Sequence, residues 1–235
     1  MELSVSEAAD RLQLDQSRIR QLVNAGDLPA RRAGKAWLVD GDAVALMSRR
    51  ARPHGRPLSE PRAWALLDLL AGGDAPWLAP PARSQVRSVV RRMESLGADE
   101  WRAALRNRGQ KVPVGGHPAA VRRLVQSREA VLAGPGQASA HGLDLVALNA
   151  RPEVYLDAKG WAHLSQSHHL DDEAWSTASA VVRLVHHDGI IARLRANERL
   201  LALAIATDCL DDANPRANHA GMELIGDAAD RALGM

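Results

Sequence analysis

The sequence has little cysteine and no long apolar segment, and both shortages limit the cellular compartments in which we expect the protein. Its 235 residues include a single cysteine, Cys209, so we expect no internal disulfide and no zinc site built from cysteines. The longest apolar run, residues 200–206, is far shorter than the roughly 20 residues that cross a bilayer. The first residues lack the basic-then-apolar layout of a signal peptide. We therefore expect a cytoplasmic protein that is neither secreted nor inserted in a membrane.

Phenylalanine is absent and tyrosine occurs once, but the composition as a whole is that of a folded protein. Hydrophobic residues make up 46% and charged residues 25% of the chain, close to average soluble usage. These values exclude intrinsic disorder, coiled coil and collagen-like structure. The length suits two or three modules better than one, so we expect a small head and a larger body.

The formal net charge of +2 hides opposite charges in the two parts of the chain. Residues 1–128 hold 22 Lys and Arg against 13 Asp and Glu, a net charge of +9, and residues 129–235 hold 8 against 15, a net charge of −7. A basic segment suits a polyanion such as nucleic acid, whereas an acidic segment suits a different partner. Ordinary solvated surface is the alternative interpretation.

Two short helices are predicted in the first 25 residues. Ser4 and Glu7 have the spacing of a capping box, and apolar residues at helical spacing follow from Val5. Asp15 is a suitable N-cap for a second helix over Gln16–Asn24. Two short helices joined by a tight turn form a helix-turn-helix, whose second helix enters the major groove of DNA.

A β-hairpin is predicted directly after the second helix. Gly26 can supply the left-handed residue that ends this helix. Strands are expected at about Leu28–Arg32 and Ala36–Val39, on either side of a tip within residues 31–35. Such a hairpin forms the wing of a winged helix-turn-helix, and we expect Trp37 to point into its core.

Residues 3–50 resemble the excisionase/MerR-like winged helix-turn-helix family. The resemblance is carried by S-x-x-E-A-A, the N-capped second helix, G-x-L-P, and R-x-G-K-x-W in the wing. It implies a DNA-binding domain over residues 1–50. A solvated helix face remains the alternative for its arginines, although arginine is well shaped for guanine or phosphate. The implied base or phosphate contacts are Ser17, Arg18, Arg20 and Gln21, and the implied backbone contacts are Arg31, Arg32 and Lys35.

A linker rich in arginine and proline is predicted at residues 51–60. Residues 49–57 contain four arginines, two prolines and a glycine, a composition that resists both helix and sheet. The segment suits an arm that lies along phosphates, and a plain linker equally well.

A helical region is predicted over residues 61–110. In one of its helices Arg83, Arg87 and Arg91 recur at every fourth position and so share a face, with an apolar face opposite. This face is either a second contact with DNA or an ordinary exposed arginine stripe.

A mixed α/β domain that binds a partner is predicted for residues 111–235. β-branched runs at 154–156 and 181–185 predict strands, with a helix between them at about Trp161–Gln166. Residues 200–210 lack a charged face over most of their length and predict a buried helix, followed by a last helix near 216–232. The expected fold class is α+β, mainly α with small β elements.

Short motifs in this C-terminal region resemble AbiEi-type antitoxins. They lie at residues 138–144, 208–212, 215–217 and 221–225. Members of that family carry a winged-helix domain in front of this region and neutralise a nucleotidyltransferase toxin encoded alongside. The resemblance implies that residues 60–235 bind such a toxin. The head departs from that family's usual winged helix in being excisionase-like.

Catalysis, a metal and a cofactor are not expected. The histidine pairs at 168–169 and 186–187 belong to no His-Glu-x-x-His motif, and no P-loop, dinucleotide fingerprint or G-x-S-x-G occurs. The sequence therefore predicts a DNA-binding transcriptional regulator that binds an operator, as a homodimer if it contacts two half-sites. The resemblance of the C-terminal region implies that this regulator acts as an antitoxin. The alternatives are a regulator controlled by a small ligand and an excisionase-like architectural protein.

Overall fold

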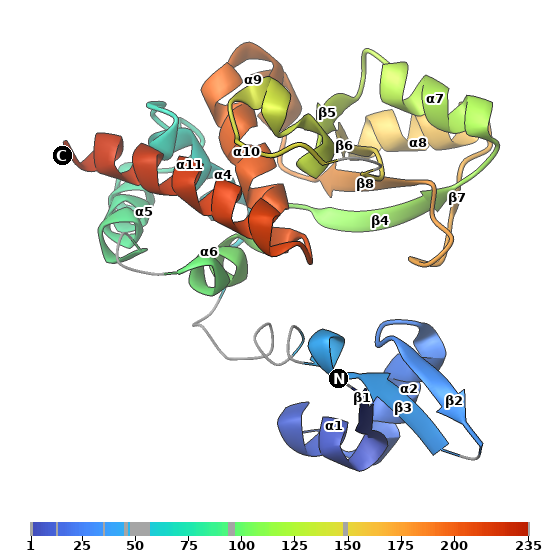
Figure 1. Ribbon diagram of the computed structural model, residues 1–235. Helices are drawn as coiled ribbons and strands as arrows, with labels where there is room; N and C mark the ends of the chain where they lie inside the picture. Colours follow the sequence, from blue (N-terminus) through green and yellow to red (C-terminus); the bar gives the residue numbers. More distant parts are fainter. Residues whose placement is uncertain are drawn as a thin grey trace. The chain divides into compact units, whose positions relative to one another are not determined.

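The computed structural model contains helices and two small sheets, which confirms the α+β fold class (Figure 1). The chain divides into two units, residues 1–54 and 55–235, and the division falls in the arginine-rich segment that the sequence predicts as a linker. Each unit is described by itself. The structure describes residues 2–12, 14–34, 36–44, 47, 57–93, 97–147 and 150–234.

In the N-terminal unit, helices pack against a three-stranded antiparallel sheet formed by the described residues. The helices include α1 (Val5–Leu12) and α2 (Gln16–Ala25), and residues 41–44 are also helical. The strands are β1 (Glu2–Ser4), β2 (Ala30–Ala33) and β3 (Ala36–Asp40), in the order β1-β3-β2. The sequence does not predict β1, because three residues are too few to show an alternating pattern. The buried core of this unit consists of Leu3, Ala8, Ala9, Leu12, Ile19, Val23, Leu28, Val39 and Val44.

The C-terminal unit is built around a five-stranded sheet of order β5-β6-β8-β4-β7. The parallel pair β6 (Glu153–Asp157) and β8 (Ala180–Val185) is connected through α8 (Ala158–His168), as the sequence predicts. The antiparallel strands are not predicted, and in one of them a proline, Pro113, interrupts the β-branched pattern. They are β4 (Gln110–Gly115), β5 (Val131–Ala133) and β7 (Asp171–Asp172).

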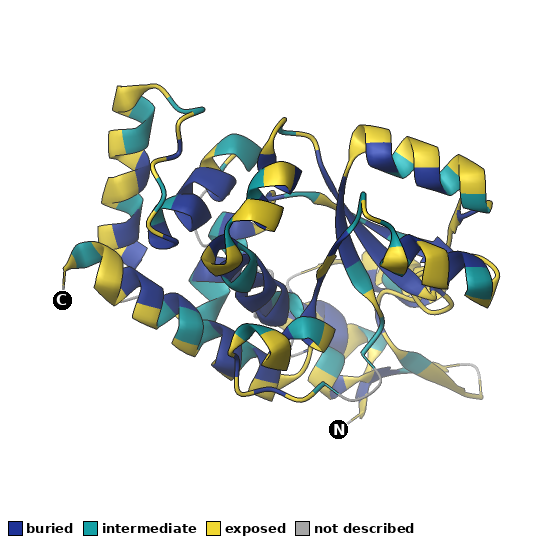
Figure 2. Ribbon diagram, turned by 90° about the horizontal axis from the view of Figure 1, so that it is seen from above, coloured by how far each residue is buried: buried dark blue, intermediate teal, exposed yellow. Residues whose placement is uncertain are grey.

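Helices cover both faces of this sheet, and Figure 2 shows the buried residues that result. α7 (Pro118–Gln126) and α8 pack on one face, while α9 (Ile190–Ala196) and α10 (Glu198–Asp211) pack on the other. Every residue of β8 is buried, as expected for a central strand covered on both sides. α10 is buried along most of its length, which confirms the predicted buried helix.

α10 is also the centre of a helical layer. It packs against α4 (Glu60–Leu70), α6 (Ala98–Leu105) and α11 (Pro215–Leu233), and α5 (Pro80–Met93) packs on α4. The sequence separates residues 61–110 from 111–235, whereas these helices share one hydrophobic core with the sheet. The separation fails because two of the helices that pack against α4, namely α10 and α11, lie more than a hundred positions later in the chain. The short 3₁₀ helices Pro135–Gln137 and Ser139–His141 pack against α10.

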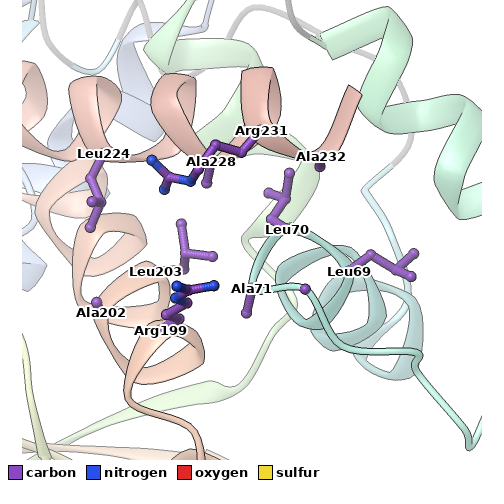
Figure 3. Close-up of a pocket in the computed structure, with 11 residues that line it drawn as sticks. Leu69, Leu70, Ala71, Arg199, Ala202, Leu203, Leu224, Ala228, Arg231 and Ala232 are labelled. Carbon is purple, nitrogen blue, oxygen red and sulfur yellow. The ribbon is translucent and has the colours of Figure 1, made fainter. Parts of the chain in front are cut away.

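A cavity of about 220 Å³ lies where α10, α11 and the C-terminal end of α4 meet (Figure 3). Small side chains at this point, among them Ala71, Ala202 and Ala228, leave the space unfilled. Two arginines, Arg199 and Arg231, lie at its border.

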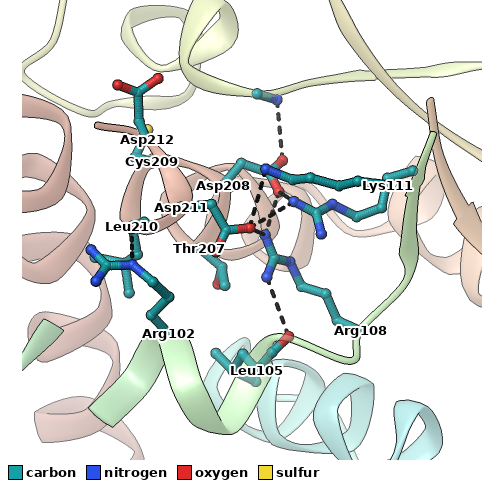
Figure 4. Close-up of polar contacts among 12 residues, drawn as sticks. Arg102, Leu105, Arg108, Lys111, Thr207, Asp208, Cys209, Leu210, Asp211 and Asp212 are labelled. Carbon is teal, nitrogen blue, oxygen red and sulfur yellow. Dashed lines mark hydrogen bonds and ion pairs between the residues drawn. The ribbon is translucent and has the colours of Figure 1, made fainter. Parts of the chain in front are cut away.

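A buried group of charged residues, here called the ion cluster, joins the sheet to α10 (Figure 4). It comprises Arg108, Arg183, Asp208 and Asp211. Arg108 is fully buried and donates hydrogen bonds to Asp208 at 2.6 Å and Asp211 at 2.7 Å. Arg183 of β8 lies 3.0 Å from Asp208 and 2.8 Å from Asp211. The hydroxyl group of Tyr155 donates a further hydrogen bond of 2.8 Å to Asp208.

The arginines keep both carboxyl groups of the ion cluster ionised. Burial by itself opposes ionisation, but the charges of Arg183 and Arg108 together lower the pKa of Asp208 below its ordinary value. Burial opposes the ionisation of Asp211 as well, and the charges of Arg108, Lys111 and Arg183 lower its pKa. Because each carboxylate is paired, neither charge is buried without compensation.

We predict that Asp208→Asn lowers the free energy of unfolding of the full chain by about 3–5 kcal/mol at neutral pH. The substitution leaves Arg108 and Arg183 short of a counter-charge and weakens the acceptor of the Gly134 N–H group. Urea unfolding measures the loss. Glu223→Gln, in an exposed pair with His219, is the control and should change the free energy by less than about 0.5 kcal/mol.

Wild type and Asp208→Asn also test how the stabilisation by the ion cluster depends on pH. A carboxyl group with a lowered pKa stabilises the folded state fully above its unfolded pKa of about 4, and this contribution is lost as the pH falls. The difference between wild type and Asp208→Asn should therefore shrink below about pH 4. A difference that stays constant on acidification would contradict the role of the ion cluster.

Candidate nucleic-acid interface

Local hydrogen bonds define the ends of the two helices in the N-terminal unit. The Glu7 carboxylate accepts a hydrogen bond from the Ser4 N–H group at 2.7 Å, and Ser4 Oγ accepts one from the Glu7 N–H group at 3.2 Å. Asp15 accepts a hydrogen bond of 2.8 Å from the Arg18 N–H group, which starts α2. Gly26 ends α2 with a φ of 79°, a left-handed conformation that favours glycine. The predicted capping box, N-cap and C-terminal glycine are all confirmed.

The exposed face of α2 carries the residues expected to contact DNA. At 100° per residue, Ser17, Gln21 and Asn24 lie along its centre, while Arg18 and Arg20 lie on its two flanks. All five residues are exposed, and α2 contains no acidic residue. Asn24 is not among the residues expected from the sequence, although a helical wheel centred on the buried side would have identified it. This face therefore presents polar groups and positive charge without a carboxylate.

Two hydrogen bonds orient the arginines of this face. Arg18 donates to Gln21 Oε1 at 3.0 Å, and Arg20 donates to Gln16 Oε1 at 3.3 Å. Each bond uses one side of a guanidinium group, which has five donors in all. Both side chains thus retain donors that can reach a guanine edge or a phosphate.

The two arginines of the wing lie on opposite faces of the sheet. Arg32 pairs in register with Trp37, and Arg31 pairs with Leu38. Because Val39 is buried in the core and side chains alternate along a strand, Trp37 and Arg32 share the face that packs against the helices. Arg31 and Leu38 lie on the outer face.

Arg32 is stacked above an aromatic ring. Its guanidinium group lies 5.0 Å from the ring centroid of Trp37, which is partly buried. Trp37, which the sequence predicts for the core, therefore also positions the Arg32 guanidinium group on the sheet face that packs against the helices. Lys35, the remaining predicted contact of the wing, lies outside the described residues.

Arg31 is engaged in an ion pair. Its Nε and Nη2 donate hydrogen bonds of 2.6 and 2.7 Å to the two carboxylate oxygens of Glu2. Hydrogen bonding from Arg31 is the main cause of the lowered pKa of Glu2. Asp40 belongs to the same outer face, so this face carries two carboxylates. The contact with the DNA backbone expected of Arg31 stays a prediction, and it would require this ion pair to open.

The second basic face expected on α5 is less uniform than the sequence indicates. Arg87 and Arg91 are exposed, but Arg83 is half-buried and donates a hydrogen bond of 3.0 Å to the Leu78 carbonyl. Arg83 lies only about 20° around the helix from buried Val90, so the apolar side adjoins the arginine side rather than opposing it. The described arginine surface on α5 is therefore limited to its later turns.

No feature of the described residues suggests a metal site. Within residues 2–234, gaps excepted, no group of three or more His, Cys, Asp or Glu residues could hold a metal ion. In the same ranges no helix is long and apolar enough to cross a membrane. Burial, followed by nearby carboxylates such as Asp208, raises the pKa of the Cys209 thiol to about 12. Cys209 thus stays a thiol at neutral pH.

A comparison with known proteins identifies a family for the N-terminal unit only. Residues 2–49 match a family described as a helix-turn-helix domain. No curated protein and no solved structure matches the chain significantly. The N-terminal unit is therefore a helix-turn-helix domain, consistent with the expected excisionase-like head. The resemblance of the C-terminal region to AbiEi-type antitoxins gains no support from these comparisons.

We predict that Arg32→Gln weakens binding of the full chain to duplexes of any sequence and reduces the dependence of log K on log salt by about 0.9. Arg31→Gln should change this slope much less, because Arg31 is paired with Glu2 on the outer face. Fluorescence anisotropy over a series of salt concentrations measures both, and circular dichroism verifies the fold. Equal changes of slope in the two variants would show that Arg31 contacts the DNA backbone as Arg32 does, despite its ion pair with Glu2.

Proposed function

We propose that this protein is a DNA-binding transcriptional regulator that reads an operator with α2. The observation that carries the proposal is the exposed face of α2, where Ser17, Gln21 and Asn24 lie between two arginines and no carboxylate is present. Amide side chains can recognise adenine and arginine can recognise guanine in the major groove. The helix-turn-helix match of residues 2–49 supports the same role.

The wing adds a contact that does not depend on sequence. Arg32 lies on the sheet face that packs against the helices, so it can reach a phosphate beside the groove that α2 enters. One head contacts one half-site. High affinity therefore requires either a homodimer or a second contact, for which exposed Arg87 and Arg91 on α5 are available. This role involves binding rather than catalysis.

Selection from a random pool of duplexes with the full chain tests this proposal. We expect one enriched motif, and we expect Arg18→Ala and Arg20→Ala each to weaken binding to it by about 1–3 kcal/mol where the arginine contacts a base. Arg122→Ala, an exposed arginine on α7, removes the same charge from the other unit and should leave the preference intact. Unchanged discrimination between the motif and random duplexes in both α2 variants would contradict recognition by α2.

A reporter gene downstream of the enriched motif distinguishes the proposed role from its alternatives. A regulator should change the expression of this gene, and the change should be lost in the variant that combines Arg18→Ala with Arg20→Ala. Sequence-specific binding without any change of expression would favour an excisionase-like architectural protein.

A narrower proposal concerns the partner of the C-terminal unit. We propose that this unit binds and neutralises a nucleotidyltransferase-type toxin, while the N-terminal unit autoregulates the operon. Asp171, Asp172 and Glu173 are exposed at the edge strand β7, and Trp175 beside them is 46% exposed. An acidic surface suits the basic cleft of an enzyme that handles nucleotides, and tryptophan is a frequent anchor of interfaces.

Co-purification with the product of the adjacent gene tests the narrower proposal. We expect the full chain to retain that protein and Trp175→Ala to retain much less, because the truncation removes the apolar anchor. Leu132→Ala, at another exposed apolar position, is the control. An adjacent gene product that never co-purifies would contradict the antitoxin role, whereas the DNA-binding role would stand.

A further inference from the structure

The cavity between α4, α10 and α11 has an apolar floor. Leu70 at the end of α4, Leu203 of α10, and Leu224 and Ala228 of α11 contribute to it. Its volume of about 220 Å³ lies below the roughly 300–1,000 Å³ of pockets that take drug-sized ligands. An occupant must therefore be small, with a hydrocarbon part that can contact these side chains.

Two cationic side chains border this cavity from different helices. Arg199 projects from the first turn of α10 and Arg231 from the last turn of α11, and Figure 3 shows their guanidinium groups on either side of Leu203. Both residues are exposed. Neither guanidinium group has a hydrogen bond or an ion pair with any residue in the described ranges. The cavity therefore has two arginines at its border that form no ion pair within this part of the chain.

The N-terminus of α10 adds to the positive potential beside Arg199. Arg199 lies in the first turn of α10, where the helix dipole favours an anion over a cation; Asn197 accepts a hydrogen bond from the Leu200 N–H group there, and Glu198 is the acidic residue of this turn. A neighbouring arginine shows the ordinary arrangement: Arg193 of α9 is paired with Asp68 at 2.8 Å and Asp74 at 3.2 Å. An anion placed between Arg199 and Arg231 would provide the counter-charge that Arg193 obtains from the chain.

We propose that this cavity binds a small carboxylic acid with an unbranched apolar tail, of about the size of octanoate. Its carboxylate pairs with Arg199 and Arg231, whose planar donors match carboxylate geometry, and its tail contacts Leu70, Leu203 and Leu224. The proposal goes beyond DNA recognition and does not depend on it. It gives the C-terminal unit a ligand site of its own.

Isothermal titration calorimetry of the full chain with sodium octanoate, without DNA, tests the proposal. We expect saturable binding that Arg199→Gln and Arg231→Gln each weaken about tenfold, the effect of one lost charged hydrogen bond. Arg122→Gln on α7 should bind octanoate like the wild type. Octan-1-ol, with the same tail and no charge, should bind at least about tenfold more weakly.

Other results would overturn the proposal. Equal affinity for octanoate and octan-1-ol would reveal a purely apolar cavity, and displacement of octanoate by inorganic phosphate would reveal a simple anion site. Wild-type affinity in the variant that carries both substitutions would place the ligand elsewhere, and absence of saturable octanoate binding by the folded wild type would exclude this ligand class. Both substituted arginines are exposed, and circular dichroism verifies that the variants fold.

Discussion

The pairing of Arg108 and Arg183 with two carboxylates of α10 is the interaction on which the C-terminal unit depends. Arg108 follows α6, Arg183 lies in the central strand β8, and Asp208 and Asp211 lie on α10, so a single group of charges connects the helical layer to the sheet. A buried charge is costly unless its partner is in place. An apolar contact between α10 and the sheet would tolerate a rotation or a shift of the helix, whereas these pairs specify one position. The register of α10 on the sheet is therefore set by charge, and its area of contact by apolar packing.

The position of α10 in turn produces the cavity. α11 crosses α10 at Gly221, where an added Cβ atom would lie 2.5 Å from the Ala206 carbonyl oxygen, so the two backbones nearly touch. Arg199 lies before this crossing on α10, and Arg231 lies after it on α11. At a rise of 1.5 Å per residue these ends lie roughly 10–15 Å along the helices from the crossing. Small side chains there do not fill the space between them, and the cavity is the result.

Features that depend on neighbours in the chain could be predicted from the sequence, and features that depend on distant partners could not. The capping box of α1, the N-cap Asp15 and the C-terminal glycine of α2 are all local, so the helices that build the DNA-binding face could be placed in advance. The different surroundings of Arg31 and Arg32 could not, because Glu2 is 29 positions away and the register that pairs Arg32 with Trp37 is known only from the structure. The ion cluster is more distant still, since Arg108 and Asp208 are separated by 100 positions and neither has a distinctive local pattern.

The ion cluster also changes the meaning of the division between a basic and an acidic part of the sequence. Arg108 belongs to the basic part, yet it is buried and neutralised by Asp208 and Asp211 of the acidic part. A charge that is paired inside the core attracts no polyanion, so the +9 of residues 1–128 overstates what DNA encounters. In the N-terminal unit, the described positive charge suited to DNA lies on α2 and on the inward face of the wing, at Arg18, Arg20 and Arg32. Attraction to DNA then arises from the same surface that reads the bases, so orientation and attraction reinforce each other during encounter.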